Sequence, residues 1–124
     1  MLTIIFLYLF CFQSIDCIKP QLLKFVPETK IFINTSIPLT CVAISGSKPF
    51  KFEWFKNHKK ILNDHEHRID SRIKITDFDS YSQLNLQNIL LVDHGEYSCF
   101  VTNSDGSDST TTILQVQGLF SYVL

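Results

Sequence analysis

The sequence predicts an all-β fold, a sandwich of two antiparallel sheets joined by one disulfide. The strongest observation is the stretch Asp93–Cys99, which reads D-x-G-x-Y-x-C: a tight turn followed by a strand whose alternate residues share one face. A second is Trp54, which lies 13 residues after Cys41 and 45 before Cys99. In sandwiches of this kind a buried tryptophan packs on the disulfide between the sheets. The third is a series of roughly seven alternating apolar segments separated by turn residues.

Length and composition place the chain among small packed domains. Its 124 residues have room for one domain, and 45% hydrophobic residues, with 13% aromatic, suit a buried core. The net charge of -1 gives no reason to expect nucleic-acid binding or attraction to a membrane surface. All 11 Lys and Arg residues lie between Lys19 and Lys74, and six acids follow Lys74. We therefore expect bases and acids on neighbouring strands to pair.

The first 17 residues indicate a secreted protein. Met1–Phe12 is apolar and uncharged, and it is too short to span a bilayer, which takes roughly 20 residues. Its length suits the core of a cleaved signal peptide, residues 1–17, although no Lys or Arg precedes it. A retained anchor is the alternative. If cleavage precedes Cys17, that thiol stays unpaired and could link two chains.

The expected strands follow the turn signals in order. Residues 18–26 and 28–33 are extended segments interrupted by Pro20 and Pro27, which suits a first strand that crosses from one sheet to the other. Alternation then predicts strands at 36–44 and 50–56, a short edge segment from Ile61, and strands at 69–77, 81–89, 93–103 and 110–116. One helical turn is expected at 89–93.

These patterns resemble the I-set of immunoglobulin domains. The resemblance rests on Trp54-Phe-Lys56 and on S-x-L-x-L-x-x-I-x-x-x-D-x-G-x-Y-x-C from Ser82 to Cys99. Pro49–Ile61 and Gly95–Val116 are most similar to arthropod Down-syndrome cell adhesion molecules (Dscam), surface proteins whose domains bind homophilically. The resemblance implies an I-set domain at 18–117 and leaves a short tail at 118–124. The chain would be either a secreted single-domain protein or part of a longer receptor.

The resemblance also implies structural roles for several residues. Tyr97 corresponds to the tyrosine corner, whose hydroxyl bonds back to the turn. Arg72 is the expected partner of Asp93, with Arg68 as the alternative. Gly95 supplies backbone freedom in the turn. We expect a Cys41–Cys99 disulfide with Trp54 against it, and Leu84 and Leu86 on the core face of their strand.

Pleat alternation also predicts a surface for binding. If Trp54 and Cys99 face the core, then Phe55, Phe100 and Ile113 face outward on three neighbouring strands. Apolar groups gathered on a solvent face suggest an interaction patch. The alternative is that lysine stems and a glycan cover them. That glycan would sit on Asn34, which begins the sequon Asn34-Thr-Ser in a predicted turn.

No residues indicate catalysis, a cofactor or a metal. His65-Glu66-His67 are adjacent and lack the converging geometry of a zinc site, so a solvated loop is expected. Ser98 near His94 does not form a triad, because alternation places Ser98 on an open sheet face. Lysines cluster around the third strand and favour a solubilising face over a polyanion site. They are Lys48, Lys51, Lys56, Lys59 and Lys60.

Three functions are consistent with these features. The first is an extracellular adhesion or recognition domain that binds a protein at a cell surface, including self-association, and performs no chemistry. The second is a secreted ligand-binding or immune-type module. The third is a structural spacer of the intracellular muscle type, which the apolar N-terminus and the sequon disfavour. No segment of this chain has the length of a transmembrane span.

Overall fold

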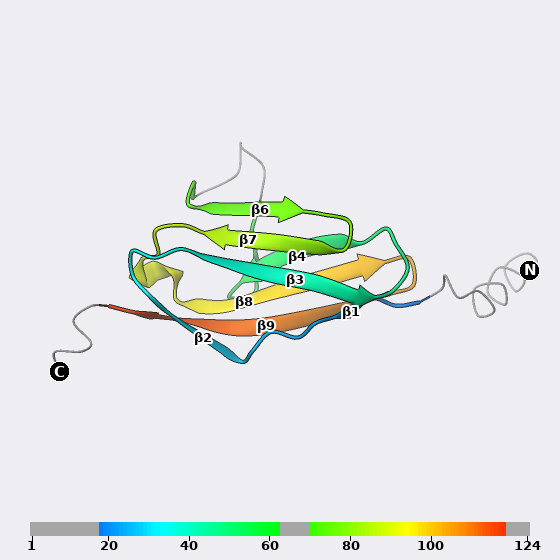
Figure 1. Ribbon diagram of the computed structural model, residues 1–124, viewed down its shortest axis with the longest axis horizontal. Coiled ribbons are helices and arrows are strands. Elements are labelled where there is room, and N and C mark those ends of the chain that lie inside the picture. Colours follow the sequence, from blue (N-terminus) through cyan, green and yellow to red (C-terminus); the bar gives the residue numbers. More distant parts are fainter. Residues whose placement is uncertain (1–17, 63–69, 119–124) are drawn as a thin grey trace, which may run out of the picture.

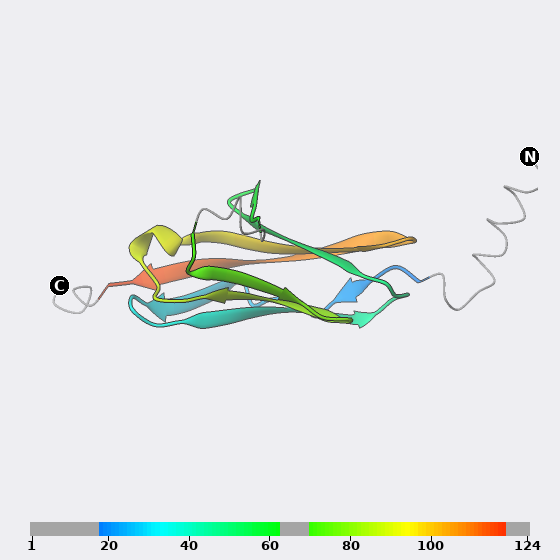
Figure 2. The same ribbon diagram turned by 90° about the horizontal axis from the view of Figure 1, so that it is seen from above.

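In the computed structural model, which describes residues 18–62 and 70–118, two sheets pack face to face (Figure 1). Figure 2 shows the same two layers from a second direction. The four-stranded sheet has the order β1 (Gln21–Leu22), β3 (Ile37–Ser45), β7 (Tyr81–Leu86) and β6 (Ile73–Asp77). The five-stranded sheet has the order β2 (Glu28–Phe32), β9 (Gly106–Gln117), β8 (Gly95–Asn103), β4 (Lys51–Lys56) and β5 (Lys59–Lys60). The predicted fold class is confirmed.

The first extended region does cross between the sheets. Strand β1 pairs antiparallel with β3, whereas β2 pairs parallel with β9, from Glu28 beside Ile113 to Phe32 beside Gln117. Pro27 lies between them, and its carbonyl oxygen accepts a hydrogen bond from the N–H of Ile113 at 3.0 Å. A proline suits this break because it has no N–H to offer a sheet.

Two strands in the middle of the chain are shorter than expected. Strand β6 begins at Ile73, because an Asp70 oxygen accepts the N–H of Arg72 at 3.0 Å and closes a turn there. Strand β7 ends at Leu86, and Ile89 follows it as a buried loop residue. The backbone of Ile89 is held by Thr35, whose carbonyl accepts its N–H at 2.8 Å. Apolar alternation alone cannot distinguish this buried loop position from a strand end.

The last strand is longer than expected. It begins at Gly106 because the side chain of Asn103 closes the preceding turn, accepting the N–H groups of Asp105 at 2.8 Å and Gly106 at 3.0 Å. Antiparallel pairing with β8 therefore runs from Asn103 opposite Gly106 to Gly95 opposite Leu114. The expected helical turn is present as a 3-10 helix, η1 (Leu91–Asp93).

The core lies around the disulfide between Cys41 and Cys99, whose Cα atoms are 6.4 Å apart. Trp54 is fully buried beside it, and its Nε1 donates to the Oγ of Ser82 at 2.9 Å. That hydroxyl in turn donates to Asp77 at 2.6 Å, so the polar Ser82 is satisfied inside the sandwich. Leu84 and Leu86 are buried on the same face of β7, as predicted.

Several expectations concern residues outside the described ranges. They are the signal peptide at 1–17 with Cys11 and Cys17, the histidines at 65 and 67, Arg68, and tail residues 119–124. Among residues 18–62 and 70–118, no helix is long and apolar enough to cross a bilayer.

Candidate interaction surface

The turn at Asp93 before β8 is a structural site. Arg72 donates to both carboxylate oxygens of Asp93, at 2.7 and 2.9 Å, and to Asp70 at 2.7 Å. The hydroxyl of Tyr97 donates to the carbonyl oxygen of Asp93 at 2.7 Å. The tyrosine corner and the Arg72–Asp93 pair are therefore confirmed, and Asp70 is a second partner of Arg72 that the sequence did not reveal.

The electrostatics of this turn follow from burial. Burial would raise the pKa of Asp93, but hydrogen bonds from Arg72 and from the N–H of Leu90 outweigh it, so the pKa lies below its usual value. Hydrogen bonding to Asp93 raises the pKa of Arg72. Burial raises the pKa of Tyr97. The pair is charged, enclosed and inaccessible to a ligand, so it serves folding.

Phe55 and Phe100 meet on the outer face of the five-stranded sheet. In the register of β4 and β8, Phe55 lies opposite Ser98 and Glu53 opposite Phe100, so the two aromatic residues are diagonal neighbours. Their rings pack edge to face with centroids 5.1 Å apart. Phe100 is 41% exposed, whereas Phe55 is half-buried. Phe100 is therefore the aromatic residue that this face offers to a partner.

Ile113 faces outward but does not join the aromatic pair. It lies opposite Glu96 in β8, and the next pair along the strands is Ser98 with Thr111. The hydroxyls of Ser98 and Thr111 are 2.8 Å apart and hydrogen-bonded, which places a polar step between Ile113 and Phe100. The expectation of one continuous patch of three apolar residues is thus wrong, because the strand register was not known.

A charged rim surrounds the aromatic pair. A hollow of about 280 Å³ is lined by Phe55, His58, Glu96, Ser98, Phe100 and Thr111. At its edge Lys60 is 2.9 Å from Glu53, and a hydrogen bond from Lys60 lowers the pKa of that carboxylate. His58 is 3.7 Å from Glu96. An apolar centre with a polar rim is the usual anatomy of a protein-binding surface.

The lysines in and around β4 do not gather into a single basic surface. Lys51 and Lys60 both approach Glu53, at 3.9 and 2.9 Å, while Lys48 is 4.0 Å from Asp79. Lys56 donates instead to the carbonyl oxygen of Val92 and lies over the ring of Tyr97. These basic groups are divided among several acidic or carbonyl partners, which favours the solubilising interpretation.

Asn34 lies in the turn between β2 and β3. Its side chain is exposed, and its backbone has a positive φ of 67°. The backbone N–H of Asn34 donates to Ile89 at 2.8 Å, and the Ser36 hydroxyl of the sequon accepts from the N–H of Asn88 at 3.2 Å. This turn is at the end of the sandwich that carries η1, and glycosylation of Asn34 stays a prediction.

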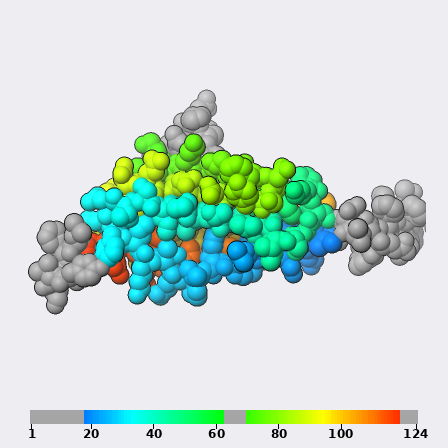
Figure 3. Space-filling model, viewed as in Figure 1, coloured from blue at the N-terminus to red at the C-terminus, as the bar shows by residue number. Residues whose placement is uncertain are grey.

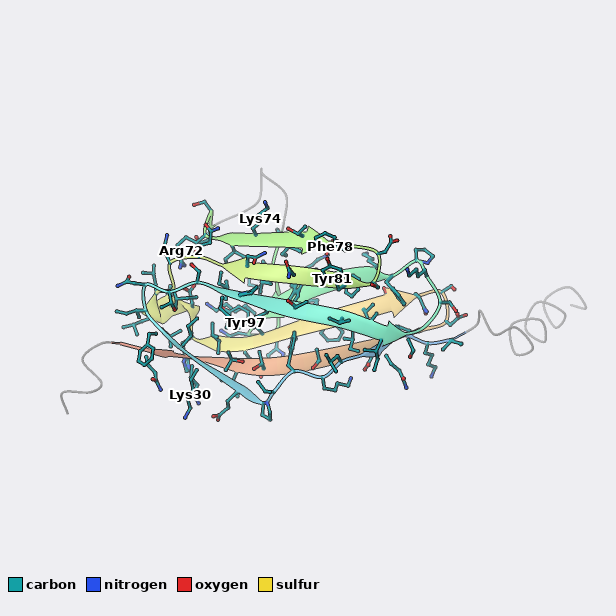
Figure 4. All side chains as sticks on the ribbon, in the orientation of Figure 1. Lys30, Arg72, Lys74, Phe78, Tyr81 and Tyr97 are labelled. Atoms are coloured by element: carbon teal, nitrogen blue, oxygen red, sulfur yellow. A yellow bond between two sulfur atoms is a disulfide. The ribbon has the colours of Figure 1, made fainter. Side chains whose placement is uncertain are left out.

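The four-stranded sheet carries a second apolar surface that sequence reasoning missed. The rings of Phe78 and Tyr81 stack with centroids 4.3 Å apart, and Tyr81 lies opposite Val42 (Figure 4). Figure 3 shows this face, with β3 in cyan and β7 in green. Ile44 on β3 is also exposed, and so is Leu23, whose N–H donates to the carbonyl oxygen of Val42 at 2.9 Å. Alternation from Cys41 already placed Val42 and Ile44 outward, so the signal was present.

Known proteins resemble this chain over most of the described residues. The family model of the immunoglobulin I-set domain matches residues 20–116. Neural cell adhesion molecule 1 of Gallus gallus is 33% identical over 99 residues, which are 80% of this chain and 9% of that protein. The membrane-bound isoform of pro-neuregulin-1 of Xenopus laevis is 33% identical over 92 residues, 72% of this chain and 13% of that protein. The chain spans only a small part of these relatives' length.

Solved structures agree on the fold. A fragment of titin, domains I67–I69, has a TM-score of 0.69 at 25% identity and covers 81% of this chain and 33% of that one. The Ig7 domain of Dscam1 has a TM-score of 0.70, covers 82% of this chain and 99% of that one, and at 23% identity shows the fold alone. The match of sequence and architecture extends from β1 to β9, and the chain belongs to the immunoglobulin I-set family.

Proposed function

We propose that this chain is an extracellular recognition domain that binds a protein partner at a cell surface through the outer face of β4, β8 and β9. Its role is adhesion or recognition, with no chemistry and no cofactor. The observation that carries the proposal is Phe100, an aromatic side chain 41% exposed on the outer face of β8 and packed against Phe55. Aromatic residues at the centre of a surface contribute most of the binding energy in protein interfaces.

Two further observations support this function. The rim of alternating charges around Phe100, with Lys60, Glu53 and Glu96, can select a partner by charge complementarity. One relative is by name a neural cell adhesion molecule, and its similarity covers 80% of this chain. The framework cysteines and the sequon at Asn34 suit an oxidising, extracellular location.

The proposal predicts that Phe100→Ser weakens binding without unfolding the domain. Beads coated with the protein are mixed with one another and with cells, and adhesion is counted. We expect Phe100→Ser to reduce adhesion about tenfold or more, because a central aromatic contact is lost. Its melting temperature should stay near that of the wild type, since the ring is partly exposed.

Phe78→Ser is the matched control, because Phe78 is 44% exposed on the opposite sheet and also stacks on a neighbouring ring. It should leave adhesion intact. If Phe78→Ser abolishes adhesion and Phe100→Ser does not, the binding face is the four-stranded sheet and the proposal is wrong. Clumping of coated beads that Phe100→Ser abolishes indicates homophilic binding through this face, and adhesion to cells alone indicates a different ligand.

A further inference from the structure

Strand β2 is an open edge of the five-stranded sheet, at the lower margin of Figure 1. In its parallel pairing with β9, the odd-numbered residues along β2 make the hydrogen bonds. The carbonyl oxygen of Pro27 accepts from the N–H of Ile113, and the N–H of Ile33 donates to the carbonyl oxygen of Gln117, both at 3.0 Å. Backbone groups alternate in direction along a strand. The N–H and C=O groups of Glu28 and Lys30 therefore point away from the sheet.

The exposed side chains of this edge carry opposite charges two residues apart. Glu28 and Lys30 are both exposed on the outer face, while Thr29 and Ile31 turn toward the core. Within residues 18–62 and 70–118, no ion pair joins Glu28 or Lys30 to another side chain. Figure 4 shows Lys30 pointing away from the sandwich. An open edge of this kind is a template for another strand.

We propose that two copies of this chain pair antiparallel through β2, about a two-fold axis at Thr29. Glu28 then lies opposite the partner's Lys30, and Lys30 lies opposite the partner's Glu28. Each of these pairs is of the hydrogen-bonded type, because the backbone groups of both residues point outward. The pairing is isologous, with the same surface on both copies, and joins the two five-stranded sheets into one.

Charge selects this register over its neighbours. If the pairing shifted by one residue, a residue whose backbone groups point outward would lie opposite one whose groups point inward. The hydrogen bonds between the two copies would then be lost. Moving the pairing by two residues in either direction keeps the hydrogen bonds but places Lys30 opposite the partner's Lys30, or Glu28 opposite the partner's Glu28. Like charges directly opposite are destabilising, whereas opposite charges stabilise a strand pair. Only the axis at Thr29 gives two attractive pairs.

The remaining residues of the edge are compatible with this register. Pro27 lies opposite the partner's Ile31, at a position where neither residue donates across the pair, so its missing N–H costs nothing. The same register brings Phe32 toward the partner's Val26. These side chains are 37% and 62% exposed, and the contact would remove apolar surface from water at both ends of the pair.

The decisive experiment uses charge reversal in the full chain, with self-association measured by sedimentation equilibrium. Glu28→Lys and Lys30→Glu should each weaken the dimer about tenfold or more, because each turns two attractive pairs into repulsive ones. An equimolar mixture of the two variants should form a heterodimer of wild-type affinity. The double variant, with both charges exchanged, should also dimerise like the wild type.

Lys74→Glu is the matched control, because Lys74 is an exposed lysine on β6, an edge strand of the other sheet. It should leave the dimer unchanged, and so should Phe100→Ser, since the β2 edge does not include the proposed ligand face. A wild-type chain that stays monomeric at about 1 mM, where even weak complexes form, overturns the proposal. So does a Glu28→Lys variant that dimerises as well as the wild type.

Cysteine substitutions resolve the register. In a mixture of Glu28→Cys and Lys30→Cys chains, oxidation should link position 28 to position 30 of the partner, because such pairs have Cα atoms about 5.5 Å apart. The linked peptides are mapped by mass spectrometry. Dominant links from 30 to 30, or from 28 to 28, would contradict the two-fold axis at Thr29.

Discussion

Asp93 is a charged residue whose side chain is only 2% exposed, and its surroundings explain why that is tolerated. Arg72 donates to both of its carboxylate oxygens, and the N–H of Leu90 donates to one of them at 2.7 Å. A buried charge that keeps its partner and its hydrogen bonds is stable, whereas removing one partner leaves the other charge buried and unpaired.

Asp93→Asn should therefore lower the free energy of unfolding by about 3 kcal/mol at pH 7, because Arg72 loses its main charged partner. The folded-state pKa of Asp93 is below its unfolded value, so this stabilisation is present above about pH 4 and is lost as pH falls through the folded pKa. Wild-type stability should decline more steeply in acid than that of the variant. Urea unfolding at several pH values measures both.

Asp79→Asn is the control for this prediction, because Asp79 is a 93% exposed aspartate whose lysine partner is 4.0 Å away. It should change neither the stability at pH 7 nor the acid dependence, as expected for a solvated pair. If Asp93→Asn behaves in the same way as Asp79→Asn, the buried pair does not stabilise the turn.

Strand β8 depends on a glycine where it leaves the turn. Gly95 has a φ of 155°, and a Cβ there would lie 2.8 Å from the side-chain oxygen of Asn57. That oxygen accepts the N–H of Glu96 at 2.9 Å, so it cannot move without breaking a bond that ties β8 to the turn after β4. The D-x-G-x-Y-x-C pattern thus needs glycine for two separate reasons.

We expect Gly95→Ala to cost about 1–3 kcal/mol of folding stability through backbone strain and the displaced Asn57. Thermal and denaturant unfolding measure this cost. Gly118→Ala provides the comparison, because no atom of residues 18–62 and 70–116 lies within 4 Å of the Cβ that it would add. Equal stability of the two variants would show that the close approach to Asn57 relaxes freely.

The strand bounds show how accurately the sequence predicted where each strand begins and ends. Alternation located β4 and β8 to within one or two residues, because both strands have one buried and one solvent-facing side. It extended β6 and β7 too far, since Asp70 closes a turn and Ile89 is buried in a loop. The first error comes from a local turn between residues two apart, and the second from a contact of Ile89 with Thr35, which is distant along the chain.

At the scale of the molecule, within residues 18–62 and 70–118, the Cys41–Cys99 disulfide joins the two sheets and charge pairs join distant parts of the chain. Lys24 is 2.7 Å from Asp108, Arg72 binds Asp93, and Lys48 is 4.0 Å from Asp79. The separation of bases and acids in the sequence is thus internal pairing, as expected.

Replacing Cys41 and Cys99 together by alanine should lower the free energy of unfolding by about 4 kcal/mol, because the disulfide closes a long loop in the unfolded chain. Guanidinium unfolding of the purified protein measures the loss, and reduction of the wild type should reproduce it. Finding both thiols free in protein purified without a reductant would contradict the bond.

The sequence by itself determined the family, the core and the inward faces of β3, β4, β6, β7, β8 and β9. These depend on local rules: alternation, a glycine in a turn, and a tryptophan between two cysteines. The tertiary structure decided which outward residues are neighbours. Register separates Ile113 from Phe100, half-buries Phe55, and opens the edge that carries Glu28 and Lys30. A shift of one residue in the pairing of two strands would turn every side chain of one strand to its opposite face. Alternation along a single strand does not determine which residues of two strands lie opposite each other.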